Sequence, residues 1–124
     1  MFLLNLSNMN RSANALVPLT AIEFEILLSL ASGALHGYAI LQDIDQRTGG
    51  RVAARPGTLY RAISRLLGAG LLAESTDAVR AQEDPRRRTY RLTPEGRRIA
   101  ALEAQRLQGQ VATARARKVL RSEG

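Results

Sequence analysis

Glycine and proline divide this sequence into short apolar segments, and the order of those segments is its strongest constraint on a fold. Apolar residues recur at helical spacing over residues 20–32, 38–47 and 58–67, and a glycine follows each run. Two short runs with strand character come next, at 71–75 and 88–92. Three short helices followed by one hairpin leave no room for a large sheet, so the fold is expected to be mainly α-helical.

Threonines mark three of the expected helix starts. Thr20 and Glu23 have the spacing of a capping box, in which each side chain accepts a hydrogen bond from the other residue's backbone N–H. Thr58 is expected to cap the third helix. Thr93 followed by Pro94 is typical of a further helix start, and the Ala-, Gln- and Arg-rich text after it predicts a long fourth helix reaching the C-terminus.

A helix, a glycine-containing turn, a second helix and a hairpin follow one another in a winged helix-turn-helix domain. We therefore expect a flexible N-terminal arm at 1–18, a winged helix-turn-helix DNA-binding domain at 19–93 and a long C-terminal dimerisation helix at 94–124. A single hairpin is too small to cover so long a helix, so its apolar stripe is expected to meet a second copy of the chain. The predicted dimerisation residues are Ile99, Leu102, Leu107, Val111 and Ala114.

Positive charge is concentrated in the second part of the chain. Lys and Arg total 18 against 11 Asp and Glu, a net charge of +7. Residues 1–50 carry two basic and four acidic side chains, whereas residues 51–124 carry sixteen and seven. The excess covers the third helix and the hairpin, where DNA lies in a winged helix, so it favours a polyanionic partner such as nucleic acid over an anionic membrane surface.

The third predicted helix carries polar residues on the face opposite its buried stripe. Arg61 and Arg65 are four residues apart and therefore share one side of the helix. Arginine can bind guanine through two hydrogen bonds in the major groove, so both are candidate base contacts, with a solvated surface as the alternative. Thr58 and Ser64 are shorter and are candidates for a phosphate or a base edge.

Two tyrosines and three adjacent arginines complete the candidate DNA contacts. Tyr38 and Tyr60 each have two readings, a hydroxyl hydrogen-bonded to phosphate or packing that supports the helices. Arg86, Arg87 and Arg88 follow the loop expected at the tip of the wing, where they fit phosphate or minor-groove contact. A solvated charged face is the alternative for these three.

Several short motifs, spread in order over residues 19–105, resemble those of the PadR-like transcriptional regulators. They are Leu19-Thr20-Ala21-Ile22-Glu23, His36-Gly37-Tyr38, Arg55-Pro56-Gly57-Thr58-Leu59-Tyr60, Leu66, Gly70-Leu71-Leu72 and Tyr90-Arg91-Leu92-Thr93-Pro94-Glu95-Gly96. The resemblance implies a winged-helix homodimer that represses transcription and releases DNA when a small hydrophobic or aromatic effector binds near the dimer interface. Members often have two consecutive aromatics on the second wing strand, whereas this chain has Thr89 before Tyr90.

Composition argues against catalysis and against a membrane protein. The chain has no cysteine and one histidine, His36, so neither thiol chemistry nor a metal site is expected, and no cofactor is predicted. Asp43 and Asp45 do not share a helix face and have no paired base, so an enzyme is not expected. No apolar run is long enough to span a bilayer and the N-terminus lacks a basic signal region, which predicts a cytoplasmic protein.

The sequence therefore favours a sequence-specific DNA-binding transcriptional regulator, most simply a repressor released by an effector. Two alternatives stay open. A winged-helix adaptor would use the same basic face to bind an acidic protein, and a nucleoid-type protein would bind DNA with no preference for one operator.

Overall fold

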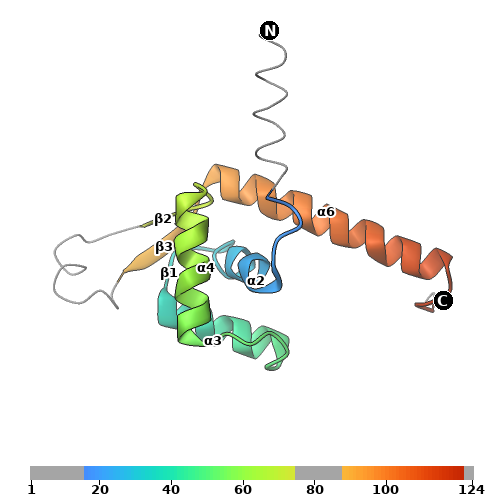
Figure 1. Ribbon diagram of the computed structural model, residues 1–124, viewed down its shortest axis with the longest axis horizontal. Coiled ribbons are helices and arrows are strands. Elements are labelled where there is room, and N and C mark those ends of the chain that lie inside the picture. Colours follow the sequence, from blue (N-terminus) through green and yellow to red (C-terminus); the bar gives the residue numbers. More distant parts are fainter. Residues whose placement is uncertain (1–15, 75–87, 122–124) are drawn as a thin grey trace, which may run out of the picture.

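The computed structural model describes residues 16–74 and 88–121. Its elements form a mainly helical fold with a small antiparallel sheet, as the sequence predicts (Figure 1). The predicted wing loop and most of the predicted N-terminal arm lie outside the described residues. The elements are α2 (Ala21–Ser29), β1 (Leu35–His36), α3 (Gly37–Thr48), α4 (Pro56–Gly68), β2 (Leu72–Glu74), β3 (Thr89–Leu92) and α6 (Pro94–Ala116).

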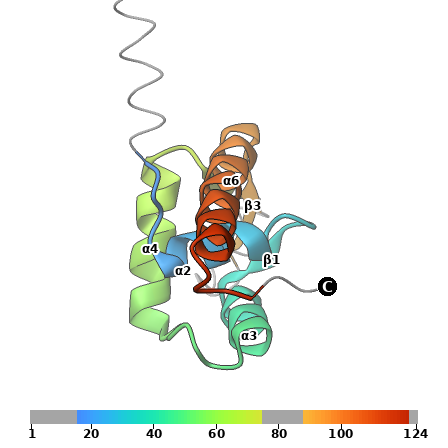
Figure 2. The same cartoon turned by 90° about the vertical axis from the view of Figure 1, so that its right-hand side faces the viewer.

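Helix α2 occupies the centre of the fold. It contacts α3, α4 and α6, and the two views at right angles show these helices around it (Figures 1 and 2). Ile26 and Leu27 are completely buried in this position. A helix that is apolar on nearly all sides is stable only when other elements surround it, which is the arrangement seen here. Leu16 and Val17, at the described end of the predicted arm, also pack against this core.

Two predicted helix starts are confirmed. The backbone N–H of Glu23 donates to Thr20 Oγ1 at 3.2 Å, and the N–H of Thr20 donates back to Glu23 Oε1 at 2.8 Å. Thr93 Oγ1 accepts from the N–H of Gly96 at 3.0 Å and so caps α6. Both caps satisfy donors that the first turn of a helix leaves without a helical partner.

The start of α4 differs from the prediction. The helix begins at Pro56 with Arg55 in the N-cap position, so Thr58 lies inside the first turn and does not cap it. Proline suits the first helical position because its fixed φ is already helical and because the N–H that it lacks would have no partner there. The turn before α4 contains Gly49 and Gly50, whose φ angles of 59° and 78° explain why glycine ends α3.

The sheet has a third strand that the sequence did not indicate. Residues 35–36, which lie between the first two predicted helices, form β1 and pair with β3, which places Leu35 opposite Tyr90. The sheet order is β1-β3-β2, and β2 pairs with β3 with Leu72 opposite Leu92. A strand of two residues is too short to show alternation, so a pattern-based reading misses it.

Helix α6 packs on the body through its N-terminal half. Ile99 is completely buried in the core of its own chain, and Leu102 packs against that core. The prediction that Ile99 lies in an uncovered stripe is therefore wrong, because it assumed that only the hairpin could cover this helix, whereas α2 also packs on it. A Cβ added at Gly96 would lie 2.1 Å from Leu71 O, so the first turn of α6 approaches the chain before β2 very closely.

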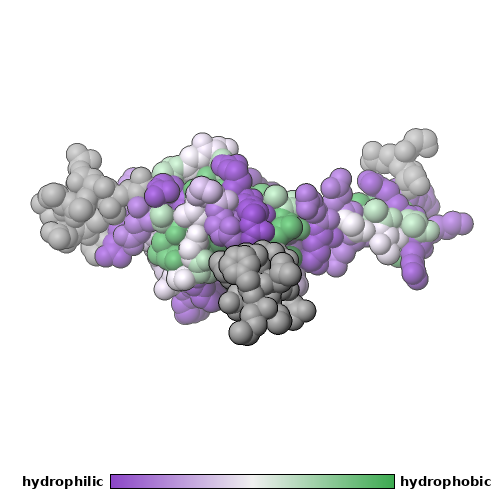
Figure 3. Space-filling model, turned by 90° about the horizontal axis from the view of Figure 1, so that it is seen from above, coloured by the Kyte–Doolittle hydropathy of each residue, from purple (hydrophilic) through white to green (hydrophobic). Residues whose placement is uncertain are grey.

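The C-terminal half of α6 extends beyond the body (Figure 1). Residues 108–113 are all exposed, and the helix ends at Ala116 instead of reaching the C-terminus as predicted. Seen from above, this projecting half is largely hydrophilic, with a small apolar group near its end (Figure 3). Leu107 and Ala114 are half-buried, and Val111 is 41% exposed.

One buried charge joins α6 to the chain before α2. Glu103 is 1% exposed, and its carboxylate accepts hydrogen bonds from the N–H of Leu19 and from Arg106. A buried carboxylate needs such partners because the interior does not solvate it.

Within the described part of the chain, no helix has the length and apolar character required to cross a membrane.

Candidate nucleic-acid interface

Helix α4 presents a polar face opposite a fully apolar one. Its buried residues are Leu59, Ala62, Ile63 and Leu66, which face the body. Arg61, Ser64 and Arg65 are exposed on the other side, and Thr58 is half-buried in the first turn. The helical period of 3.6 residues separates the two sets, so the amphipathic pattern alone directs these polar side chains outward.

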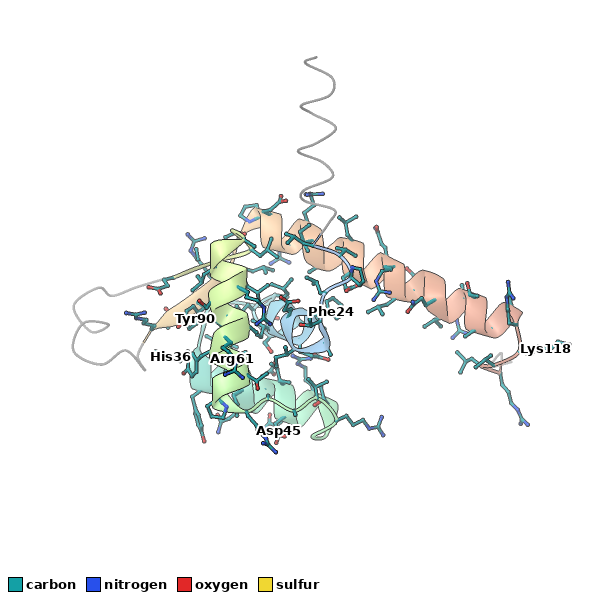
Figure 4. All side chains as sticks on the ribbon, in the orientation of Figure 1. Phe24, His36, Asp45, Arg61, Tyr90 and Lys118 are labelled. Atoms are coloured by element: carbon teal, nitrogen blue, oxygen red, sulfur yellow. The ribbon has the colours of Figure 1, made fainter. Side chains whose placement is uncertain are left out.

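Arg61 lies on this exposed face of α4, far from Lys118 at the end of α6 (Figure 4). One of its guanidinium nitrogens would lie 3.6 Å from a Cβ built at Gly57, so the side chain runs back along the first turn of the helix. Among the described residues, none forms an ion pair with Arg61. The first turns of α4 therefore carry an exposed positive charge that no described carboxylate balances.

Arg65 is placed differently, although the sequence made it equivalent to Arg61. Its Nε donates to Glu23 Oε2 on α2 at 3.3 Å. Burial alone would raise the pKa of Glu23, but hydrogen bonds from Thr20 and the nearby Arg65 outweigh it and hold the pKa below its ordinary value. The two partners are 42 residues apart in sequence, and no local pattern signals such a contact.

Tyr38 and Tyr60 come together where α3 and α4 begin. Tyr38 is 66% exposed, which does not fit packing beneath the third predicted helix. Tyr60 is 41% exposed and lies against Gly37, where an added Cβ would be 2.6 Å from the tyrosine hydroxyl. Together with Leu41, Pro56 and Leu59, these residues line a cavity of about 340 Å³. Gly37 thus permits the close approach of the two helix starts.

The three predicted wing arginines are only partly described. Arg88 is exposed and its Nη1 lies 3.6 Å from Glu74 Oε1, across the β2–β3 pair. This separation gives Arg88 a nearby carboxylate, but both side chains remain well exposed, so the ion pair is weak. Arg86 and Arg87 lie outside the described residues.

A polar cluster that sequence reasoning missed fixes α3 against α2. Arg47 donates to Asp43 Oδ2 at 2.8 Å, to Glu25 Oε1 at 2.6 Å and to Ser29 Oγ at 2.7 Å. The hydrogen bonds from Arg47 and Ser29 lower the pKa of Asp43. Asp43 is thus part of an ion pair that holds α3, the helix before the turn, in position.

Helix α3, the glycine turn, α4 and the antiparallel sheet define the class of the protein as a winged helix-turn-helix. The family can also be assigned. The sequence pattern of the transcriptional regulator PadR-like family matches residues 26–102. The chain belongs to this family, as its ordered motifs indicate.

Two curated relatives have comparable sequences. A 37.1 kDa protein of transposon TN4556 from Streptomyces fradiae is 42% identical over 90 residues, which are 69% of this chain and 24% of that protein. The transcriptional regulator Rv3488 of Mycobacterium tuberculosis is 40% identical over 77 residues, covering 62% of this chain and 66% of the regulator. The chain thus spans about a quarter of the length of the transposon protein and about two thirds of the regulator.

Solved structures show the same fold. A PadR family transcription regulator from Clostridium difficile has a TM-score of 0.63 at 21% identity, covering 78% of this chain and 97% of that one. RosR from H. salinarum has a TM-score of 0.60 at 25% identity, with 85% and 99% covered. A transcriptional regulator from Clostridium thermocellum has a TM-score of 0.58 at 28% identity, with 81% and 92% covered.

Proposed function

We propose that this PadR-like chain is a sequence-specific DNA-binding regulator that inserts α4 into the major groove. The observation that carries the proposal is the exposed charge of Arg61 on the polar face of α4, which no carboxylate of the described residues balances. In helix-turn-helix proteins the N-terminal turns of the second helix contact base edges. Arg61 lies in those turns, where a guanidinium can reach guanine O6 and N7 together.

The remaining contacts follow from position around α4. Thr58 and Ser64 lie on or near the same face and suit a base edge or a phosphate. Tyr38 and Tyr60 project at the start of the two helices, where the first helix of the motif crosses the DNA backbone, so their hydroxyls are assigned to phosphates. The wing arginines 86–88 are assigned to phosphate or minor-groove contact on the basis of their charge.

The regulator acts as a homodimer in this proposal. The projecting half of α6 offers Leu107, Val111 and Ala114, and Leu102 borders them nearer the body. Half-buried and exposed apolar residues on a helix that extends away from its own core are stabilised when a second helix covers them. A two-fold dimer reads an inverted repeat with its two recognition helices about 34–36 Å apart, or a multiple of that distance.

Repression by operator occupancy and release by a small ligand form the regulatory part of the proposal. A cavity of about 420 Å³ lies between α2 and α6 and is lined in part by Leu19, Phe24 and Leu107. Its apolar residues suit the body of a small hydrophobic or aromatic molecule, and Glu25 and Arg106, which also line it, suit polar groups on that molecule. Because the cavity adjoins the proposed dimer helix, a ligand there would change the separation of the two recognition helices and so weaken DNA binding. DNA would then weaken ligand binding by the same factor.

The test is footprinting on DNA that flanks the gene, followed by affinity measurements on the protected fragment and on random duplex. Arg61→Ala should cost about 1–3 kcal/mol on the protected fragment and relax the preference at one base pair. Arg115→Ala is the matched control, because it removes an exposed arginine from the far end of α6. Its effect should be equal on both DNAs.

The same measurements distinguish the alternatives. Equal affinity for the flanking fragment and for random DNA would replace the proposal with a nucleoid-type binder. Absence of salt-dependent binding to either duplex would remove DNA as the partner and leave an adaptor for an acidic protein, since phosphate contacts release counterions and give a steep salt slope.

A further inference from the structure

The contact between Arg65 and Glu23 joins the proposed recognition helix to the start of α2. Glu23 is held on both carboxylate oxygens, Oε1 by the N–H of Thr20 at 2.8 Å and Oε2 by Arg65 Nε at 3.3 Å. The side chain of Glu23 is 16% exposed and that of Arg65 is 53% exposed. The carboxylate is therefore fixed in the fold, whereas the guanidinium remains accessible to solvent.

The position of Glu23 is also tied to α6. Thr20, whose hydroxyl and N–H both bind Glu23, directly follows Leu19. The N–H of Leu19 donates to the buried Glu103 of α6. A carboxylate held by the cap of its own helix, one residue from a backbone contact with α6, cannot follow Arg65 if the arginine moves toward another anion, so the arginine must leave it.

We propose that Glu23 is a positioning residue that restrains Arg65 and competes with DNA phosphates for its guanidinium. This inference rests on the proposed DNA-binding function. Arg65 lies in the last turn of α4, beyond the N-terminal turns that reach base edges, so phosphate is the group on DNA that it suits. Glu23 thereby lowers the general affinity of the protein for duplex DNA and leaves the selection of bases to Arg61.

The size of the competition follows from the exposure of the pair. Ion pairs with one well-exposed partner shift an equilibrium by a factor of about 1.5 to 5. A phosphate can therefore displace Glu23 from Arg65, and the displacement reduces DNA affinity by a factor within that range. Competition of this size adjusts binding without abolishing it.

Glu23→Gln is the informative variant because glutamine also completes a capping box, so the start of α2 is retained while the charge is removed. Affinity for a random duplex is measured against salt concentration, in the natural protein and in an Arg65→Gln background. Glu23→Gln should bind about threefold more tightly at low salt, with an unchanged slope of log K against log salt, because Arg65 contacts a phosphate in both proteins. In the Arg65→Gln background, Glu23→Gln should have no such effect.

Glu95→Gln is the matched control for the loss of one negative charge. Glu95 pairs with Arg98 on α6 at 2.7 Å, whereas Arg65 pairs with Glu23, so the control changes a different ion pair. The proposal is overturned if Glu23→Gln leaves the affinity unchanged, or if it strengthens binding equally in both Arg65 backgrounds or no more than Glu95→Gln does. Failure of the natural protein to bind any duplex would instead reject the proposed function, and this inference with it.

A second measurement needs no change at Glu23. The Nε–H resonance of Arg65, assigned by its loss in Arg65→Gln, should shift when random duplex is added to the natural protein. A resonance that does not change with saturating DNA would show that Arg65 stays with Glu23, and this too overturns the proposal.

Discussion

The two halves of α6 differ in almost every respect except their secondary structure. In the N-terminal half, Gly96, Ile99 and Glu103 are buried against the rest of the chain. In the C-terminal half, residues 108–113 are exposed and Val111 is the first large apolar side chain that the body does not cover. The same helix therefore belongs to the core at one end and to a surface at the other.

The comparison shows that an apolar stripe along a helix does not define a single environment. Ile99 and Val111 both belong to the stripe read from the sequence, but only Val111 remains exposed in the folded chain. The first half is stabilised by contacts inside one chain, so its stability is independent of protein concentration. Under the dimer proposal, the second half depends on a second chain and therefore on concentration.

The largest expected effect is the difference in stability loss when one apolar side chain is truncated in each half of α6. Ile99→Ala should lower the free energy of unfolding by about 2–5 kcal/mol, because it leaves a cavity in the core. Val111→Ala should change it by no more than about 0.5 kcal/mol at low protein concentration. Urea denaturation checks both values, and sedimentation should show weaker self-association for Val111→Ala alone.

Equal losses of stability in these two variants would contradict the division of α6. A Val111→Ala protein that self-associates as strongly as the natural chain would remove the projecting half from the proposed interface.

The next effect compares the two glycines of α6. Gly96→Ala should destabilise the fold by about 1–3 kcal/mol, because the new Cβ meets Leu71 O at 2.1 Å and backbone has to move. A Cβ at Gly109 has no described atom within 4 Å, so Gly109→Ala should stabilise the helix by about 0.5–1 kcal/mol. Thermal melting of both variants under one condition gives the two signs, and a destabilising Gly109→Ala would mean that this side of the projecting half is covered.

The smallest effect concerns a half-exposed contact in the body. Hydrogen bonds from Arg47 and Ser29 lower the pKa of Asp43 from the ordinary 3.8, so the unfolded chain binds a proton there more readily than the folded one. The contact stabilises the fold when the pH is above the ordinary pKa of Asp43. This contribution is lost as the pH falls through the lower pKa that Asp43 has in the folded chain. Solvent screening limits it to less than about 1 kcal/mol.

Asp43→Asn should therefore reduce the loss of stability between about pH 5 and about pH 3. Asp45→Asn, which changes an exposed carboxylate on the same helix, is the control for the loss of one negative charge. Identical profiles of stability against pH for Asp43→Asn and the natural chain would show that the charge of Asp43 in the Arg47 cluster contributes nothing measurable to the stability of the fold.

The parts of the fold that were predicted correctly depend on local signals. The capping box at Thr20, the cap at Thr93 and the end of α3 at Gly49 each need only neighbours within one turn, so the sequence displays them directly. The helical stripe of α4 was also correct, since its apolar residues recur with the helical period over the whole element.

The parts that were missed depend on residues far apart in the chain. Arg65 pairs with Glu23 across 42 residues, and Glu103 accepts from Leu19 across 84 residues. A charged residue in a helix is predicted to be exposed to solvent unless its partners are known. The sequence therefore did not indicate that Glu103 is buried. The closeness of Gly96 to Leu71 is likewise invisible in sequence, because a helical glycine has no periodic signature.

The strand pairing of the sheet does not depend on the length of the segment that joins β2 to β3. Leu72, Ala73 and Glu74 are paired one to one with Leu92, Arg91 and Tyr90, and β3 is held on its other side by β1. These pairings are fixed on the described side of the connection, so insertions and deletions between residues 75 and 87 need not shift any of them. The length of the segment between residues 75 and 87 can therefore change while the paired strands and the core stay the same.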